Sequence, residues 1–127
     1  MLKFTKYAAA TSVVLLTLTT GCSRLDRLQG KSSASKIALA KHLKETGAIL
    51  YSSPWCPYCN EQKKVLGKEA FSQLNVVDCE GKKAQLDLCQ KANIKHIPTW
   101  EIKGQQYGGM SLEELAEVSD YKGDRKF

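Results

Sequence analysis

The residues with the clearest chemical potential are two cysteines, Cys56 and Cys59, in the segment Trp55-Cys56-Pro57-Tyr58-Cys59. A pair spaced by two residues can close a small disulfide ring or bind a metal ion. A short apolar run precedes the pair, and Pro57 suits the first position of a helix. The sequence therefore predicts that Cys56 lies at a helix N-terminus, where free N–H groups and the helix dipole stabilise a thiolate.

In this interpretation Cys56 is the nucleophile, and Cys59, one turn into the helix, displaces whatever becomes attached to it. Pro57 has no N–H group, so it fixes the first turn while removing one possible donor to the sulfur. Trp55 is expected to form an apolar wall beside the sulfur, with packing as the alternative, and Tyr58 either to tune the thiolate by hydrogen bonding or to line the rim. We therefore predict thiol–disulfide exchange, with Trp55, Pro57 and Tyr58 in contact with the substrate.

A proline before a predicted strand, Pro98, is the second candidate feature. Such a proline can follow a cis bond in a tight turn, although trans bonds are more frequent. If this turn lies against the cysteine helix, the backbone of Ile97 can pair with an extended substrate chain. Ile97 and Pro98 are therefore predicted substrate-binding residues, whereas His96 and His42 are interpreted as solvated surface histidines.

Cys79 and Cys89 form a second pair, and a bond between them would close a loop of 11 residues. A structural disulfide is the preferred interpretation, because small exported domains gain stability from such closures. Two free buried thiols, or a regulatory pair that exchanges with the first, are the alternatives. A zinc site built from all four cysteines is disfavoured by the long spacing of this pair, so no metal and no cofactor are predicted.

The N-terminal segment predicts export. Residues 1–6 include two lysines, and residues 7–20 carry no charge, a run too short for a typical transmembrane helix but suited to a signal peptide. The following Gly21-Cys22 resembles the lipobox of bacterial lipoproteins. We therefore predict a signal peptide over 1–21, lipidation of Cys22, a flexible tether over 22–34, and an extracytoplasmic, membrane-anchored protein in a periplasm or thylakoid lumen. An ordinary secretory signal or an uncleaved anchor is the alternative.

Hydrophobic periodicity and turn residues predict one small α/β domain over 35–127. The expected elements are a helix from Ser35 to Glu45, a strand over 48–51, a helix starting at Cys56 or Pro57, a strand over 74–77, a helix from Lys82 to Ala92, strands over 99–103 and 105–108, and a last helix opened by a capping box at Ser111. A crossover helix then separates the first two strands, and a hairpin closes the sheet. The charged tail over 122–126 is expected to fray.

Composition excludes several classes of protein. The chain has 127 residues, 43% of them hydrophobic and 25% charged, which is typical of one compact domain and not of a disordered chain. The formal charge of +6 falls to +4 if Lys3 and Lys6 are cleaved off, since 17 basic residues then stand against 13 acidic ones. These charges are mixed along the chain, so nucleic-acid binding is not expected.

Three motifs in the same order resemble the thioredoxin superfamily: Trp55-Cys56-Pro57-Tyr58-Cys59, Ile97-Pro98-Thr99 and Gly108-Gly109. More narrowly, Gly67-Lys68-Glu69-Ala70, Asp78-Cys79 with Cys89, the extension to Trp100-Glu101-Ile102, and Ser111-Leu112-Glu113-Glu114-Leu115 resemble the thioredoxin-like domain fused to vitamin K epoxide reductase homologues of cyanobacteria and plants. The resemblance implies a three-layer sandwich around a four-stranded mixed sheet. It also implies a cis bond before Pro98, thiol-bearing secreted client proteins, and a quinone-reducing membrane protein that re-oxidises the dithiol.

The resemblance has one departure at the site. Thioredoxins carry a buried aspartate six places before the first cysteine, where it helps to move the proton of the second, and this chain has Leu50 there. Glu61 and Lys63 are interpreted as surface charges of the helix rather than substitutes.

The predicted function is an exported, membrane-tethered thiol–disulfide oxidoreductase working in the oxidising direction. The lipid anchor at Cys22 would take the place of the covalent fusion to the membrane partner. A reductant or isomerase would use the same residues. A glutaredoxin-like enzyme is a further alternative, since Cys56-Pro57-Tyr58-Cys59 and Gly108-Gly109 occur in that branch.

Overall fold

The structure, a computed structural model, describes residues 32–82 and 84–127. The predicted signal peptide over 1–21, the predicted lipidation site Cys22 and most of the predicted tether lie outside these residues. The elements, in chain order, are α1 (Ala34–Glu45), β1 (Ile49–Ser52), α2 (Pro57–Leu66), α3 (Lys68–Phe71), β2 (Asn75–Asp78), α4 (Leu86–Lys91), β3 (Thr99–Ile102), β4 (Gln105–Tyr107) and α5 (Leu112–Val118). Within the described ranges, no helix has the length and hydrophobicity needed to cross a bilayer.

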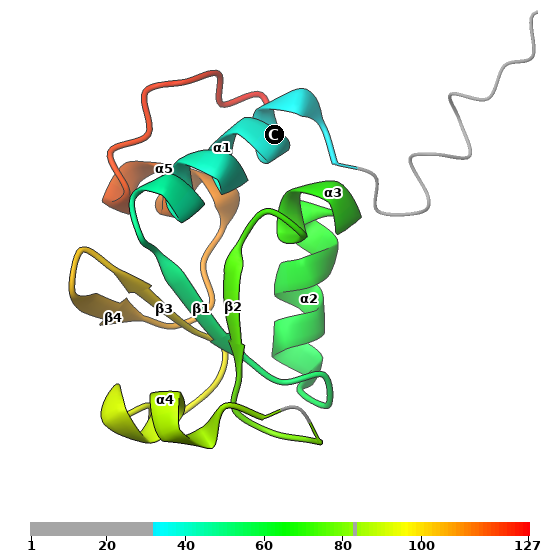
Figure 1. The fold of residues 1–127 in the computed structure, drawn as a ribbon. Helices are drawn as coiled ribbons and strands as arrows, with labels where there is room; N and C mark the ends of the chain where they lie inside the picture. The colour runs from blue at the N-terminus through cyan, green and yellow to red at the C-terminus, as the bar shows by residue number, and fades with distance from the viewer. Residues whose placement is uncertain (1–31, 83) are drawn as a thin grey trace, which may run out of the picture.

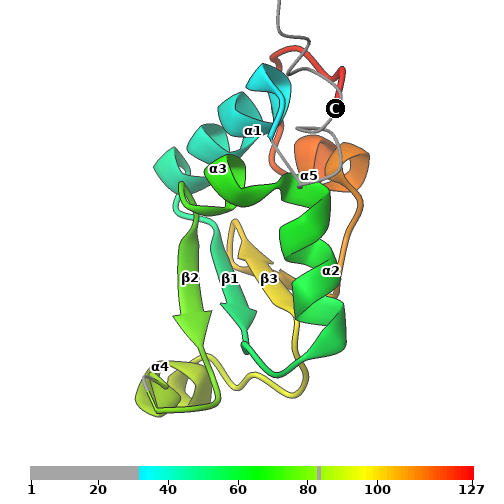
Figure 2. The same cartoon turned by 90° about the vertical axis from the view of Figure 1, so that its right-hand side faces the viewer.

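The four strands form one mixed sheet in the order β2-β1-β3-β4. β1 pairs in parallel with β2, and Ser52 lies in register with Asp78. β3 pairs antiparallel with β1 and with β4, which makes β3 and β4 the closing hairpin. The predicted fold class, a thioredoxin-like α/β sandwich with a four-stranded mixed sheet, is confirmed, and Figures 1 and 2 show the helices around the sheet.

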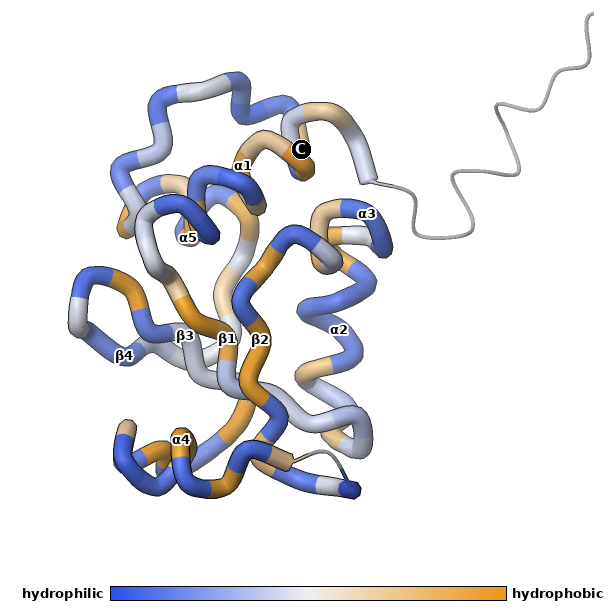
Figure 3. Tube along the Cα trace, in the orientation of Figure 1, coloured by the Kyte–Doolittle hydropathy of each residue, from blue (hydrophilic) through white to orange (hydrophobic). Residues whose placement is uncertain are grey.

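Successive side chains along each strand point to opposite faces of the sheet, so the buried hydrophobic residues form two clusters, one on each face. Leu50 and Trp100 belong to the larger cluster, which includes buried side chains of α1, α2, α3 and α5. Tyr51 and Val77 point to the other face, where they pack with Cys89 of α4. Figure 3 shows the hydrophobic stretches that β1, β2 and α4 contribute. One face of the sheet therefore carries several helices, and the smaller cluster on the other face depends on the short helix α4.

The structure adds one helix that was not predicted and shortens another that was. The helix that begins at Pro57 ends at Leu66, because Gly67 follows with φ of 84°, a conformation that favours glycine, and the chain then starts the separate helix α3. The helix predicted from Lys82 to Ala92 is shorter and covers Leu86–Lys91. The last helix agrees with the prediction, since Ser111 and Glu114 form the capping box.

Both ends of the described domain are held by hydrogen bonds. The hydroxyl of Ser32 donates to the carbonyl of Leu66, at the C-terminal end of α2, over 2.9 Å, and accepts from the N–H of Ala70. Ordered contacts therefore begin three residues before the predicted boundary at residue 35. The predicted fraying of the tail is wrong, because the carbonyl of Lys126 accepts a hydrogen bond from Ser35 and Phe127 packs against the larger cluster. Figure 1 shows the C-terminus beside α1.

Candidate active site

The Cys56 side chain caps the N-terminus of α2. Its Sγ accepts a hydrogen bond from the N–H of Cys59 at 3.2 Å, and Pro57 occupies the first helical position. Cys56 is half-buried and Cys59 is buried, and neither takes part in a disulfide. A backbone N–H aimed at a sulfur at a helix N-terminus favours the thiolate, so the geometry suits Cys56 as the attacking group.

The surroundings of Cys59 favour the protonated thiol. Burial, followed by the neighbouring Cys56, raises the pKa of the Cys59 thiol above its ordinary value of 9.0, while the Ser52 hydroxyl and the Ser53 backbone partly offset this shift by hydrogen bonding to the sulfur. Ser52 and Ser53 are themselves buried. The two thiols therefore differ in access, as an attacking and a resolving cysteine would.

The turn before β3 lies against the first cysteine. The bond between Ile97 and Pro98 is cis, and the Sγ of Cys56 lies 3.7 Å from the carbonyl oxygen of Ile97. A groove of about 540 Å³ runs beside this turn and is lined by Tyr58, Glu61, Gln62, His96, Ile97, Pro98, Gly108, Gly109, Met110 and Ser111. The structure thus brings together Cys56, Tyr58, Ile97 and Pro98, which were predicted to meet a substrate.

Trp55 and Tyr58 are the two most exposed large hydrophobic side chains in the described ranges, with 75% and 76% of their surface accessible. Pro57 is exposed between them. Exposed aromatic groups beside a reactive sulfur suit contact with a visiting chain rather than packing within the domain.

Gln62, which the sequence prediction did not single out, connects α2 to the rest of the site. Its side-chain oxygen accepts from the indole N–H of the fully buried Trp100 at 2.8 Å and from the N–H of Met110, and its amide donates to the carbonyl of Met110 at 2.8 Å. These bonds tie the cysteine helix to β3 and to the loop before α5. A polar residue on a helix gives no local signal of such a role, because its partners are distant in the sequence.

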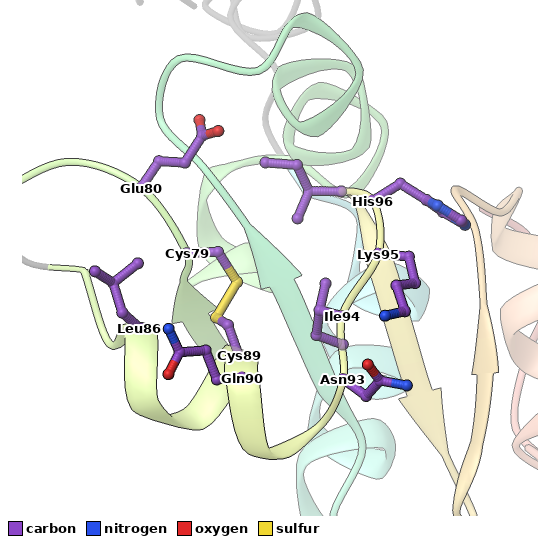
Figure 4. Close-up of a pocket in the computed structure, with 10 residues that line it drawn as sticks. Cys79, Glu80, Leu86, Cys89, Gln90, Asn93, Ile94, Lys95 and His96 are labelled. Atoms are coloured by element: carbon purple, nitrogen blue, oxygen red, sulfur yellow. A yellow bond between two sulfur atoms is a disulfide. The ribbon is translucent and has the colours of Figure 1, made fainter.

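Cys79 and Cys89 are joined by a disulfide between the end of β2 and α4. The bond lines a pocket of about 450 Å³, and Figure 4 shows Glu80, Leu86 and Gln90 on one side of it and Asn93, Ile94 and Lys95 on the other. With these two sulfurs bonded to each other, a four-cysteine zinc site lacks two of its ligands. No group of three or more His, Cys, Asp or Glu side chains with metal-binding geometry occurs within 32–82 and 84–127.

The other charged or titratable residues that the sequence analysis considered each lie in different surroundings. Glu61 pairs with Lys64 on the helix surface at 2.8 Å, and Lys63 holds its ammonium 5.3 Å from the centre of the Phe71 ring. His96 is exposed. The interpretation of His42 as a surface residue is wrong, because its ring is half-buried, bonded to the carbonyl of Ser119 at 2.8 Å.

Alkylation of the reduced protein at neutral pH should modify Cys56 and spare Cys59, as peptide mass spectrometry would show. Burial raises the pKa of Cys59, so at neutral pH a smaller fraction of Cys59 than of an ordinary cysteine is present as the thiolate. By the same linkage, the protonated Cys59 stabilises the folded state fully below the ordinary thiol pKa, and this contribution is lost as pH rises through the higher folded value. Equal labelling of both cysteines at neutral pH would contradict the assignment.

The chain is similar to curated proteins that include the following two. Thiol-disulfide oxidoreductase LTO1 of Arabidopsis thaliana is 40% identical over an alignment of 105 positions, which covers 77% of this chain and 28% of that protein. N-acetyl-S-hydroxy-L-cysteine reductase of Bacillus subtilis is 33% identical over 64 residues, which are 50% of this chain and 69% of that protein. The chain thus spans little more than a quarter of the first relative and about two thirds of the second. No protein-family model matches the chain.

The fold and both relatives agree with the chemistry of the cysteine pair at the start of α2. One relative is named for thiol–disulfide exchange and the other for a reduction at a cysteine derivative. The chain belongs to a family of thioredoxin-like oxidoreductases.

Proposed function

We propose that this protein is an exported, membrane-tethered enzyme that introduces disulfides into client proteins through Cys56 and Cys59. The observation that carries the proposal is the contrast between the two thiols. Cys56 is half-buried, its sulfur accepts a hydrogen bond from a backbone N–H and lies next to the carbonyl of Ile97, whereas Cys59 is buried behind it. The exposed rings of Trp55 and Tyr58 flank the approach.

In the oxidising direction the cycle starts from a disulfide between Cys56 and Cys59. A client thiolate attacks the Sγ of Cys56, the enzyme disulfide breaks, and Cys59 leaves and takes up a proton. A second client thiol loses its proton and attacks the client sulfur of the mixed disulfide, which releases the thiolate of Cys56. The client gives up two electrons and gains a disulfide, and the enzyme becomes the dithiol. An electron acceptor, which we propose to be a quinone-reducing membrane protein resembling vitamin K epoxide reductase, then regenerates the enzyme disulfide.

The direction of exchange is testable by equilibrating the protein with glutathione buffers and measuring the fraction of Cys56–Cys59 disulfide. The hydrogen bond from the N–H of Cys59 to the sulfur of Cys56 favours the reduced enzyme, and a more stable reduced form raises the potential and makes the disulfide a better oxidant. We expect a potential of about −120 to −180 mV, and a value near about −270 mV would instead indicate a reductant. Rapid turnover of a glutathione mixed disulfide would favour the glutaredoxin-like alternative.

A membrane tether attached before Ser32 is compatible with access to the site. Ser32 is bonded to the C-terminal end of α2, while Cys56 caps the opposite end, about 15 Å away for a ten-residue helix. Figures 1 and 2 show the described chain entering beside α3, at the end of the molecule away from the loop between β1 and α2. A domain held at Ser32 would therefore present Cys56 away from the lipid.

Replacement of the predicted lipidation site, Cys22→Ser, should move the protein from the membrane fraction to the soluble fraction of the producing cells. Loss of the acyl chains removes about 0.8 kcal/mol for every methylene group buried in the lipid. Immunoblotting of the separated fractions measures the change, and Ser23→Ala serves as the matched control. An unchanged distribution of Cys22→Ser would contradict lipid anchoring.

A further inference from the structure

A second cavity, separate from the groove beside Pro98, is lined in part by Cys59. It has a volume of about 430 Å³ and is lined by Ser52, Ser53, Pro54, Cys59, Asn60, Lys63, Phe71, Val76 and Asp78. None of these residues lines the groove beside Pro98. Cys59 therefore has an approach that is separate from the one a client uses, and the cavity is both large enough and polar enough to admit water.

Cys59 needs a partner for its proton. In each direction of exchange it passes between a protonated thiol and a sulfur bonded to Cys56, so a proton leaves or arrives at a side chain that is only 2% exposed. Besides Cys56, with which it forms the disulfide, the groups that hydrogen-bond to its sulfur are the Ser52 hydroxyl and the Ser53 backbone, which donate hydrogen bonds and are poor acceptors of a full proton. Leu50, further back on β1, is apolar and fully buried.

Among the residues that line the cavity, Asp78 is the one carboxylate. Ser52 and Asp78 are partners in the parallel pairing of β1 with β2, so they are neighbours on one face of the sheet. Val76, two positions before Asp78, lines the same cavity, while Val77 between them belongs to the hydrophobic cluster on the other face. Strand alternation therefore directs Asp78 toward the cavity in which Cys59 lies.

Lys63 supplies a positive charge to the same cavity. It follows Cys59 by one helical turn, and its ammonium is held over the Phe71 ring. An ammonium cannot accept a proton at neutral pH, but it favours the negative charge that passes between sulfur and carboxylate during transfer. The other titratable groups around Cys59 are Cys56, on its own helix, and Glu80, which accepts a hydrogen bond from Ser53 at 2.7 Å.

We propose that Asp78 accepts and returns the proton of Cys59 through water in this cavity. In the reducing direction, the Cys59 thiol transfers its proton to the carboxylate of Asp78 as its sulfur attacks Cys56 and the client thiolate leaves. In the oxidising direction, the protonated carboxylate returns that proton to Cys59 as the enzyme disulfide breaks. The proposal rests on the proposed function, because it concerns the second step of the same exchange.

The test is a stopped-flow reaction of the reduced protein with one equivalent of a symmetrical aromatic disulfide that releases a coloured thiolate. The first release reports attack by Cys56, and the second reports attack by Cys59 on the mixed disulfide. In Asp78→Asn, we expect an unchanged first phase and a second phase slowed about 100-fold at neutral pH, the low end of general-base effects. The difference should disappear at high pH, where hydroxide removes the proton of Cys59. Asp78→Glu, which keeps a carboxylate, should retain most of the rate.

The matched control is Asp87→Asn, which removes the same charge from an exposed position on α4 that does not line the cavity. A second phase at the wild-type rate in Asp78→Asn, or equal slowing in Asp87→Asn, would overturn the proposal. If Asp78→Asn does not fold, the comparison of Asp78→Gln with Asp78→Glu decides the question in the same way. Absence of the first phase in the wild-type protein would instead contradict the proposed function.

Discussion

Replacement of Cys56 by alanine should reduce the rate at which the protein oxidises a reduced client at least about 1,000-fold, because the group that forms the covalent intermediate is lost. Cys59→Ala should lose turnover as well, yet its Cys56 thiolate should still attack the disulfide of an oxidised client and release one client sulfur as a thiolate. The mixed disulfide between Cys56 and the client then persists, since no second thiol of the enzyme displaces it. Non-reducing electrophoresis and mass spectrometry detect that complex directly.

The two variants are matched controls for each other, because each removes one sulfur from the same turn of α2. Trapped client should accumulate in Cys59→Ala and be absent in Cys56→Ala. The reverse result, with Cys59 carrying the client, would contradict the division of roles that burial and the hydrogen bond at Cys56 indicate. Trapping in producing cells would also identify the natural clients.

Local sequence signals predicted the elements that present the cysteines. Pro57 marks the start of α2, and the residues Ser111 and Glu114 mark the start of α5, because caps and first turns depend on near neighbours in the chain. No end was predicted for α2, although a glycine is visible at position 67. A glycine permits a positive φ without requiring it, so the sequence alone did not separate a helix end from a glycine within a helix.

The parts of the site that were not predicted depend on contacts between distant segments. Gln62 became part of the site through Trp100 and Met110, which lie 38 and 48 residues further along the chain. Asp78 reaches the neighbourhood of Cys59 through the strand register, which pairs it with Ser52. Such partners are set by the packing of the sheet against α2, and no short pattern encodes them.

Removal of the second disulfide should lower the stability of the domain. The double variant Cys79→Ala/Cys89→Ala opens a loop of 11 residues, since the sequence separation is 10, and the chain-entropy model gives a loss of about 3 kcal/mol. The bond also fastens α4 over the smaller hydrophobic cluster, where Cys89 packs with Tyr51 and Val77. This face has few other buried side chains among the described residues, so we expect the packing of α4 on this face to be lost first.

Chemical denaturation of the oxidised wild-type protein and of the double variant measures the difference in the free energy of unfolding. A structural disulfide predicts lower stability with an unchanged redox equilibrium between Cys56 and Cys59. A regulatory pair predicts a changed equilibrium, because electrons would then pass between the two cysteine pairs. The pocket beside Cys79 makes this comparison necessary, since an accessible sulfur is open to attack by a small thiol. Unchanged stability together with a shifted equilibrium would contradict the structural assignment and favour the regulatory one.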